Sequence, residues 1–189
     1  MEIWVTSDHH FGHCNIIKYG NRPFKDVHEM DETMIDLWNQ NVKSNDHVYH
    51  LGDVTMARCG KQQSDPFVRL ILRLKGHKRL LLGNHDHFPV EIYREAGFEK
   101  VRGTGRWFEG LLLSHYPVHP GSLGTARANV HGHVHQNPSP APVQWTPKSN
   151  IQPYINVSVE VTEYRPITLG EINTRILTAI RTAGQLFQP

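Results

Sequence analysis

The chain of 189 residues is poor in cysteine. Only Cys14 and Cys59 occur, and the sequence contains no Cys-x-x-Cys pair. Two cysteines cannot build a disulfide framework, and they exclude a structural zinc site made from several thiolates. We therefore expect a protein of a reducing compartment, the cytoplasm.

Long apolar runs and an excess of one charge are also missing. No run of about 18 apolar residues occurs, so no transmembrane helix is expected. The N-terminus lacks the basic and apolar segments of a secretory signal. Lys and Arg number 20 against 18 Asp and Glu, a net charge of +2. This balance predicts no membrane partner and no strong nucleic-acid footprint.

Histidine, by contrast, is abundant. The chain holds 14 His residues, which are scattered in short motifs rather than gathered in one run. Histidine is the commonest metal ligand and a frequent acid or base near neutral pH. Its abundance favours metal binding or acid–base chemistry.

Short apolar runs alternate with segments of helical spacing. The runs have the length and apolar character of buried strands, and they span residues 3–5, 47–51, 79–82, 111–113, 128–130 and 154–161. Helical spacing predicts helices over residues 30–42, 67–72, 89–96 and 168–183. Ser64-Asp65-Pro66 is expected to cap the second helix, and Thr168 with Glu171 matches a capping box. The alternation predicts one α/β domain over residues 1–189.

Two segments stand apart from this pattern. Residues 137–153 hold five of the twelve prolines, which predicts a surface loop stiffened toward polyproline II. The alternative is a lid over a site, because the loop leaves directly after His133-Val134-His135. Residues 184–189 resemble the remnant of a cleaved tag and are given no function.

Five polar motifs follow the apolar runs. They are Asp8-x-His10, Gly52-Asp53, Gly83-Asn84-His85-Asp86, Ser114-His115 and Gly132-His133-x-His135. In an extended chain the side chains of residues i and i+2 point the same way, so Asp8 and His10 can face one metal ion. His133 and His135 have the same spacing and the same expected consequence. Carboxylate, amide and imidazole donors together suit Mn, Fe, Co or Zn.

Taken together and in this order, the five motifs resemble the calcineurin-like metallophosphoesterase superfamily. The flanking segments 8–17, 21–24, 156–160 and 164–167 are similar to a compact branch associated with phages and bacteria. The resemblance implies an α/β fold, a four-layer α/β/β/α sandwich of two mixed β-sheets flanked by helices. The sequence departs from larger relatives after Asp53, where Val54-Thr55-Met56 stands in place of a further polar residue.

The resemblance also implies a set of metal ligands. Two divalent metal ions are expected, Mn²⁺ first, with Fe, Ni, Co or Zn as alternatives. Asp53 would bridge both ions. The first ion would be held by Asp8, His10 and His135, and the second by Asn84, His115 and His133.

Two such ions, about 3.5–4 Å apart, can share a hydroxide and clamp a phosphate group. His85 is expected to protonate the leaving oxygen, with Asp86 orienting its ring. For Asp86 the alternative is a turn or cap carboxylate. We further expect His13, Asn15 and Arg22 to bind the substrate. Alternatively, His13 and Asn15 close a turn and cap the next helix, and Arg22 forms a salt bridge with a carboxylate.

The sequence thus predicts an enzyme, a metallophosphoesterase that hydrolyses phosphodiesters, with cyclic nucleotides among the candidates. A phosphomonoesterase or a nuclease on the same site is the alternative reaction. A catalytically silent metal-binding scaffold is the alternative of another class, although the complete ligand set and His85 favour the enzyme. The expected partner is a small phosphoester substrate, nucleotides included.

Overall fold

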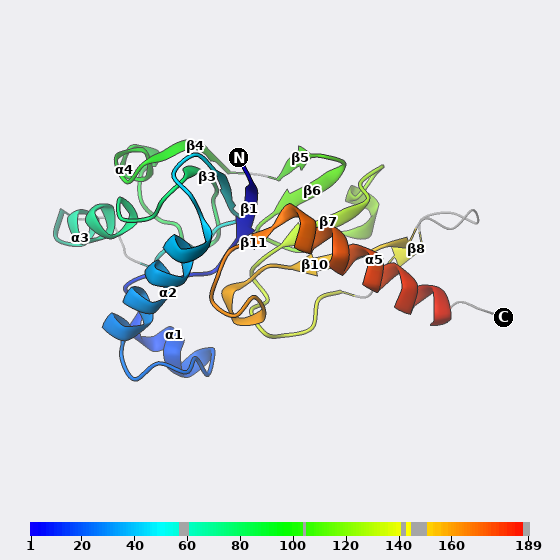
Figure 1. Ribbon diagram of the computed structural model, residues 1–189, viewed down its shortest axis with the longest axis horizontal. Helices are drawn as coiled ribbons and strands as arrows, with labels where there is room; N and C mark the ends of the chain where they lie inside the picture. The colour runs from blue at the N-terminus through cyan, green and yellow to red at the C-terminus, as the bar shows by residue number, and fades with distance from the viewer. Residues whose placement is uncertain (57–60, 104, 141–142, 145–150, 187–189) are drawn as a thin grey trace.

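Two mixed β-sheets pack face to face in the computed structural model, with helices around them (Figure 1). The structure describes residues 1–56, 61–103, 105–140, 143–144 and 151–186. The predicted fold class, two mixed sheets flanked by helices, is confirmed. No helix among the described residues is both long enough and apolar enough to cross a membrane.

The first sheet carries four parallel strands and one antiparallel edge strand. Its order is β11 (Ile167–Thr168), β1 (Ile3–Thr6), β2 (His47–His50), β3 (His77–Leu81) and β4 (Phe98–Arg102). Strands β1 to β4 are parallel, and β11 is antiparallel to β1. Parallel strands end at the same edge of a sheet, so the loops that follow them lie side by side there.

The second sheet has the order β10 (Tyr154–Asn156), β7 (Ala128–His131), β6 (Leu111–Ser114) and β5 (Arg106–Phe108). Its first three strands are parallel, and β5 is antiparallel to β6. A separate antiparallel pair joins β8 (Val143–Gln144) to β9 (Ile151–Gln152). Both strands lie within the proline-rich segment 137–153. Residues 141–142 and 145–150 of that segment lie outside the described residues, so the loop and the lid both stay predictions.

Alternation along the strands divides the core in two. Trp4, Val48 and Leu80 point to one face of the first sheet and pack against helices. Their neighbours Val5 and Tyr49 point to the other face, toward the second sheet. The helices on the first face are α1 (Cys14–Tyr19), α2 (Val27–Asn41), α3 (Lys61–Ile71) and α4 (Val90–Glu95).

Helix α5 (Leu169–Leu186) lies along the edges of both sheets and contributes Ile172 and Ile176 to the core between them (Figure 1). Its capping box is formed as predicted, because Glu171 N–H donates to Thr168 Oγ1 (3.0 Å) and Thr168 N–H donates to Glu171 Oε2 (2.7 Å). The outer face of the second sheet is covered by Leu123 and Ala126, next to the 3₁₀ helix η1 (Pro120–Ser122).

Several predicted boundaries are wrong. Residues 154–161 do not form one strand, because β10 ends at Asn156 and the chain continues into the 3₁₀ helix η2 (Val159–Val161). Helix α3 begins at Lys61, so Ser64-Asp65-Pro66 lies inside the helix rather than capping it. Helix α5 continues to Leu186, past the expected end at residue 183. The remaining residues assigned to a tag remnant, 187–189, lie outside the described residues.

Replacing Trp38 by alanine should destabilise the fold more than other single changes in α2. Its side chain is fully buried, and its Nε1–H donates to Lys75 O (2.9 Å). Trp38→Ala is expected to lower the free energy of unfolding by about 3–5 kcal/mol, since it leaves a cavity and an unpaired carbonyl. Urea denaturation measures this. The exposed Asp36→Ala on the same helix should change it by less than about 0.5 kcal/mol.

Candidate metal centre

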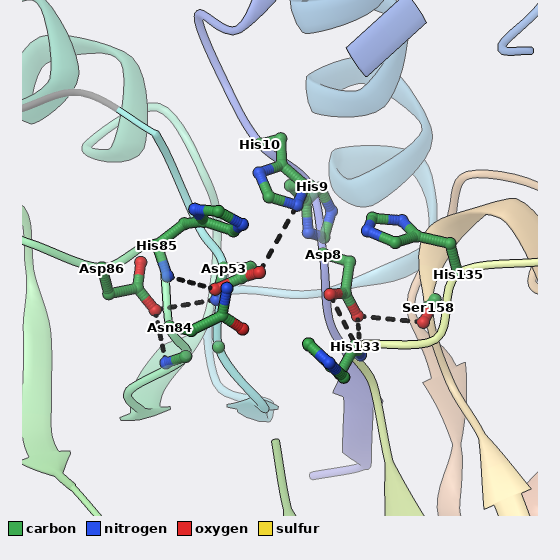
Figure 2. A network of polar contacts seen from close by, with 12 residues as sticks. Asp8, His9, His10, Asp53, Asn84, His85, Asp86, His133, His135 and Ser158 are labelled. Carbon is green, nitrogen blue, oxygen red and sulfur yellow. Dashed lines mark hydrogen bonds and ion pairs between the residues drawn. The ribbon is translucent and has the colours of Figure 1, made fainter. Parts of the chain in front are cut away.

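The loops that follow β1, β2, β3 and β7 converge at one end of the two sheets, and their polar side chains face one another (Figure 2). His115, which follows β6, joins them through contacts with Asn84 and Asp53. Backbone hydrogen bonds hold these loops together. Asp8 N–H donates to Gly52 O (3.0 Å) and His10 N–H donates to Asp53 O (3.0 Å). Similarly, Gly132 N–H donates to His115 O (2.9 Å). These backbone hydrogen bonds therefore hold the loops next to one another.

Two clusters of side chains there can each hold a metal ion. One consists of Asp8, His10 and His135, and the other of Asp53, His115 and His133. Within each cluster the donor atoms lie within 4.8 Å of one another.

Asp53 and Asn84 link these clusters into one centre. The Asp53 Oδ2 atom is 3.5 Å from both His10 Nε2 and His115 Nε2, so this carboxylate stands between the clusters. Asn84 Oδ1 is 2.9 Å from His115 Nε2, which puts the amide at the second cluster. All seven residues implied as ligands thus come together in the expected division. Their role as ligands stays a prediction.

The environment of these groups fits divalent cations. Neither ring nitrogen of the buried His10 has a hydrogen-bond partner among the described residues. Burial and the neighbouring Asp8 carboxylate raise the pKa of Asp53 to about 7. A cation between the clusters would give the orphaned imidazole a partner and would offset the cost of two adjacent buried carboxylates. The mixed oxygen and nitrogen donors suit Mn, Fe, Co, Ni or Zn without selecting one.

The backbone is unusual at the candidate ligands. A positive φ occurs at Asp8 (61°), His10 (53°), Asp53 (55°), His133 (70°) and His135 (51°). Non-glycine residues rarely adopt this left-handed region, and such strain concentrates at functional sites. The surrounding hydrogen bonds therefore hold these residues in backbone conformations that are energetically unfavourable for non-glycine residues.

This backbone corrects the expectation of an extended chain. Strand β1 ends at Thr6, and Asp8 and His10 reach one cluster through left-handed turns. His133 and His135 share the same spacing, yet they join different clusters. Asp8 and His10 therefore do lie in one cluster, as predicted, although the chain that carries them is not extended. The same spacing argument was wrong for His133 and His135, which lie in different clusters.

Two glycines permit the loops to approach so closely. A Cβ atom on Gly83 would stand 2.5 Å from Asp53 N and closer still to Asp53 Oδ1. A Cβ atom on Gly132 would overlap Ser7 and the Asp8 carboxylate. Both glycines are therefore required by space rather than by their own φ angles.

Ser158 holds the Asp8 carboxylate in place. Its hydroxyl donates to Asp8 Oδ2 (2.9 Å), and His133 N–H donates to both carboxylate oxygens (3.1 and 3.0 Å). Sequence reasoning missed Ser158 as a site residue. The only signal was its place in the segment 156–160, which resembles the end of the compact branch.

Glu160 is a second residue that the sequence did not reveal. Its Oε1 accepts from His135 Nδ1 (2.9 Å), which leaves His135 Nε2 as the free lone pair for a metal ion. The same oxygen accepts from Arg22 Nε (3.0 Å) and Arg22 Nη2 (2.7 Å). Glu160 therefore orients one candidate ligand from η2.

Arg22 is not placed to bind substrate, so that prediction is wrong. Besides Glu160, its guanidinium donates to Asp8 O (2.7 Å) and His9 O (2.7 Å). The residue is buried and its donors are directed inward. The alternative of a salt bridge is the one observed, and it braces the loop that carries Asp8 and His10.

Replacing Glu160 by glutamine should weaken metal binding without unfolding the chain. The amide keeps the shape but loses the negative charge that pairs with Arg22 and orients His135. We expect the affinity for one of two Mn²⁺ ions to fall about 10–100-fold, as typical for the loss of an outer partner of a metal-binding His. Calorimetric titration with Mn²⁺ measures it, and the exposed Glu163→Gln on the same turn should leave both ions unaffected.

Asp86 does not orient the His85 ring. Its carboxylate accepts backbone N–H groups of Gly83 (2.8 Å), Asp53 (2.7 Å) and Val54 (3.0 Å). No hydrogen bond joins it to the His85 ring within the described part of the chain. The alternative of a turn carboxylate is the observed one, and it ties the loop after β3 to the loop after β2.

His85 itself lies at the site. Its backbone N–H donates to Asp53 Oδ1 (2.9 Å), and its ring centroid is 5.4 Å from that of His10. Burial, followed by the neighbouring His87 and His115, lowers the pKa of His85. The ring lines a cavity of about 310 Å³ together with His10 and His135.

The two remaining substrate candidates separate in the structure. His13 lines this cavity, with its ring centroid 5.8 Å from that of His10. Asn15 is exposed and is absent from the described residues that line the cavity. His13 thus stays a candidate for substrate contact, whereas the geometry does not support Asn15.

Fold and site define a two-sheet α/β sandwich that gathers two His/Asp clusters at the ends of its strands. No family model matches the sequence. The uncharacterized protein MJ1445 of Methanocaldococcus jannaschii is 36% identical over 171 residues, covering 90% of this chain and 89% of that protein. The gene 66 protein of Mycobacterium phage L5 is 37% identical over 162 residues, covering 70% and 76%. The chain belongs to the family of these two proteins.

Solved structures include a similar chain. The crystal structure of AQ665 from Aquifex aeolicus, a protein of unknown function, superimposes with a TM-score of 0.65 at 27% identity and covers 92% of this chain and 98% of that one. A nuclease of Pseudomonas putida, MPE, gives a TM-score of 0.48 at 18% identity over 70% and 61% of the two chains. This last likeness is too remote to support an inference about activity.

Proposed function

We propose that this protein is a metal-dependent phosphoesterase of the calcineurin-like type that acts on phosphodiesters. The observation that supports the proposal is the arrangement of two donor clusters around one shared carboxylate, Asp53. Asp8, His10 and His135 would hold one ion, and Asn84, His115 and His133 the other. Two divalent ions bound there, with manganese as the first candidate, would supply Lewis acidity and would lower the pKa of a water molecule.

The chain's own residues have distinct tasks in this proposal. Asp53 and Asp8 concentrate negative charge, which makes the centre selective for cations. Glu160 and Ser158 hold His135 and Asp8 in position. His85 faces the cavity and donates a proton to the leaving oxygen.

The charges around the cavity favour a diester over a monoester. Among the described residues, no Lys or Arg lines the cavity, and the nearby Arg22 is committed to Glu160. A phosphodiester carries one negative charge, whereas a monoester carries close to two at neutral pH and needs more compensation. The described lining, which adds no further cation, is therefore better suited to the diester.

The proposal is tested by hydrolysis of bis-p-nitrophenyl phosphate and p-nitrophenyl phosphate, with Mn²⁺, after removal of metal by EDTA, and after its return. We expect turnover that requires the metal and a higher kcat/KM for the diester. A higher kcat/KM for the monoester would overturn the substrate choice. Two bound ions without turnover on either compound would favour the metal-binding scaffold and overturn the enzyme.

His85→Ala should show its effect through the leaving group. A dinucleoside monophosphate has a poor alkoxide leaving group and needs a proton, so its kcat should fall about 10²–10⁴-fold. Bis-p-nitrophenyl phosphate releases a stable phenolate, and its hydrolysis should fall less than about tenfold. The exposed His28→Ala is the matched control and should retain both rates. Equal losses on the two substrates would contradict a role as proton donor.

A further inference from the structure

The cavity next to the candidate metal centre is lined by imidazole rings and by apolar and aromatic side chains. The rings of His10, His135 and His85 belong to the candidate centre itself. Ile16 and Tyr19 of helix α1 also line the cavity, together with Met56 from the loop after β2. Because His85 shares this cavity, a phosphodiester held at the centre would extend its leaving group across it toward α1.

Tyr19 is placed unusually for an aromatic residue. Its side chain is 71% exposed although it lines the cavity, and its ring centroid is 6.5 Å from that of His13. An exposed aromatic ring beside a phosphate site is a stacking platform that every nucleobase can use. The residue is the last one of helix α1.

Two amide side chains also line the cavity. Gln136 and Asn137 follow directly after His135 and line the cavity. Asn137 Nδ2 donates to Val134 O (3.0 Å), whereas the exposed Gln136 amide has no hydrogen-bond partner among the described residues. An amide presents a donor and an acceptor together, which matches the edge of a nucleobase.

We propose that this cavity binds the base of a nucleoside, stacked on Tyr19 and hydrogen-bonded by Gln136, so that nucleotide diesters are the substrate class. The inference rests on the proposed phosphodiesterase function and deepens it. The cavity volume of about 310 Å³ is of the size that accepts a small ligand. The described residues that line it are imidazole, apolar, aromatic, glycine and amide residues.

Equilibrium binding separates the base from the phosphate. Calorimetry would give the Kd of AMP and of ribose 5-phosphate for the Mn²⁺-loaded protein, with phosphate release monitored to exclude turnover. We expect AMP to bind about tenfold more tightly than ribose 5-phosphate, which is the size of one base stacked on an aromatic ring. Tyr19→Ala should abolish this advantage while the Kd of ribose 5-phosphate stays unchanged, and Tyr19→Phe should retain it.

Controls distinguish this inference from the proposed function. Trp107→Ala removes another exposed aromatic residue, 51% exposed on β5, and should leave both Kd values unchanged. Equal affinities for AMP and ribose 5-phosphate in a protein that hydrolyses bis-p-nitrophenyl phosphate would overturn the base site and leave the function intact. A tighter Kd for AMP in a protein without turnover would overturn the function and support the base site. A tenfold advantage that survives in Tyr19→Ala would overturn the assignment of Tyr19.

Discussion

Asp53→Asn is expected to abolish metal-dependent hydrolysis, with a loss on the order of a thousandfold or more. The reason is geometric, because Asp53 Oδ2 is 3.5 Å from one imidazole of each cluster and is the only carboxylate in that position among the described residues. Asparagine keeps the size and can still accept the His85 N–H, but it removes the charge between the clusters. Mn²⁺ titration and the rate on bis-p-nitrophenyl phosphate measure the two effects.

Stability provides the control for this variant. Asp53 is buried beside Asp8, and removing one of two adjacent buried carboxylates relieves repulsion in the metal-free protein. The free energy of unfolding without metal is therefore not expected to fall. Asp36→Asn changes an exposed carboxylate on α2 and should keep full activity. If the Asp53→Asn protein kept its activity, Asp53 could not be an essential shared ligand of a two-ion centre.

Gly83→Ala should also cause a large loss of activity, through a steric clash rather than through the loss of a charge. The new Cβ would meet the backbone nitrogen of Asp53 at 2.5 Å, and backbone cannot move aside as a flexible side chain can. The loops after β2 and β3 would have to separate, which displaces Asp53 and Asn84 together. We expect a loss of activity of about a hundredfold or more and a decrease of about 1–3 kcal/mol in the free energy of unfolding.

Gly103→Ala is the matched glycine control. A Cβ atom there would meet nothing within 4 Å, and the residue has no positive φ. Its activity and unfolding free energy should match the wild type. If Gly83→Ala bound Mn²⁺ and turned over substrate as the wild type does, the close contact between the two loops could not be essential.

Local patterns predicted the regular elements where hydrophobic spacing was clear. Helix α2 and the capping box of α5 follow directly from side-chain periodicity and a reciprocal pair of hydrogen bonds. Strand β4 was missed, because its exposed positions carry Glu99, Lys100 and Arg102 and mask the alternation. Strand β5 was missed as well, because its three residues are too few to show a period. The strand predicted over residues 154–161 was wrong, because the Asn156 side chain accepts Ser158 N–H (2.9 Å) and the chain turns there.

The available donor residues, and the order in which they follow the strands, could be predicted from the amino-acid sequence alone. This was possible because each motif is local, and because parallel strands bring their following loops to one edge. The resemblance also implied that His133 and His135 belong to different ions, whereas their spacing alone suggested one shared ion. The three-dimensional structure supplies the physical reason for the division, which is a left-handed backbone conformation at both residues. It also decided that Arg22 braces the centre and that Glu160 orients His135, because the Arg22–Glu160 ion pair spans 138 residues of sequence and leaves no local pattern.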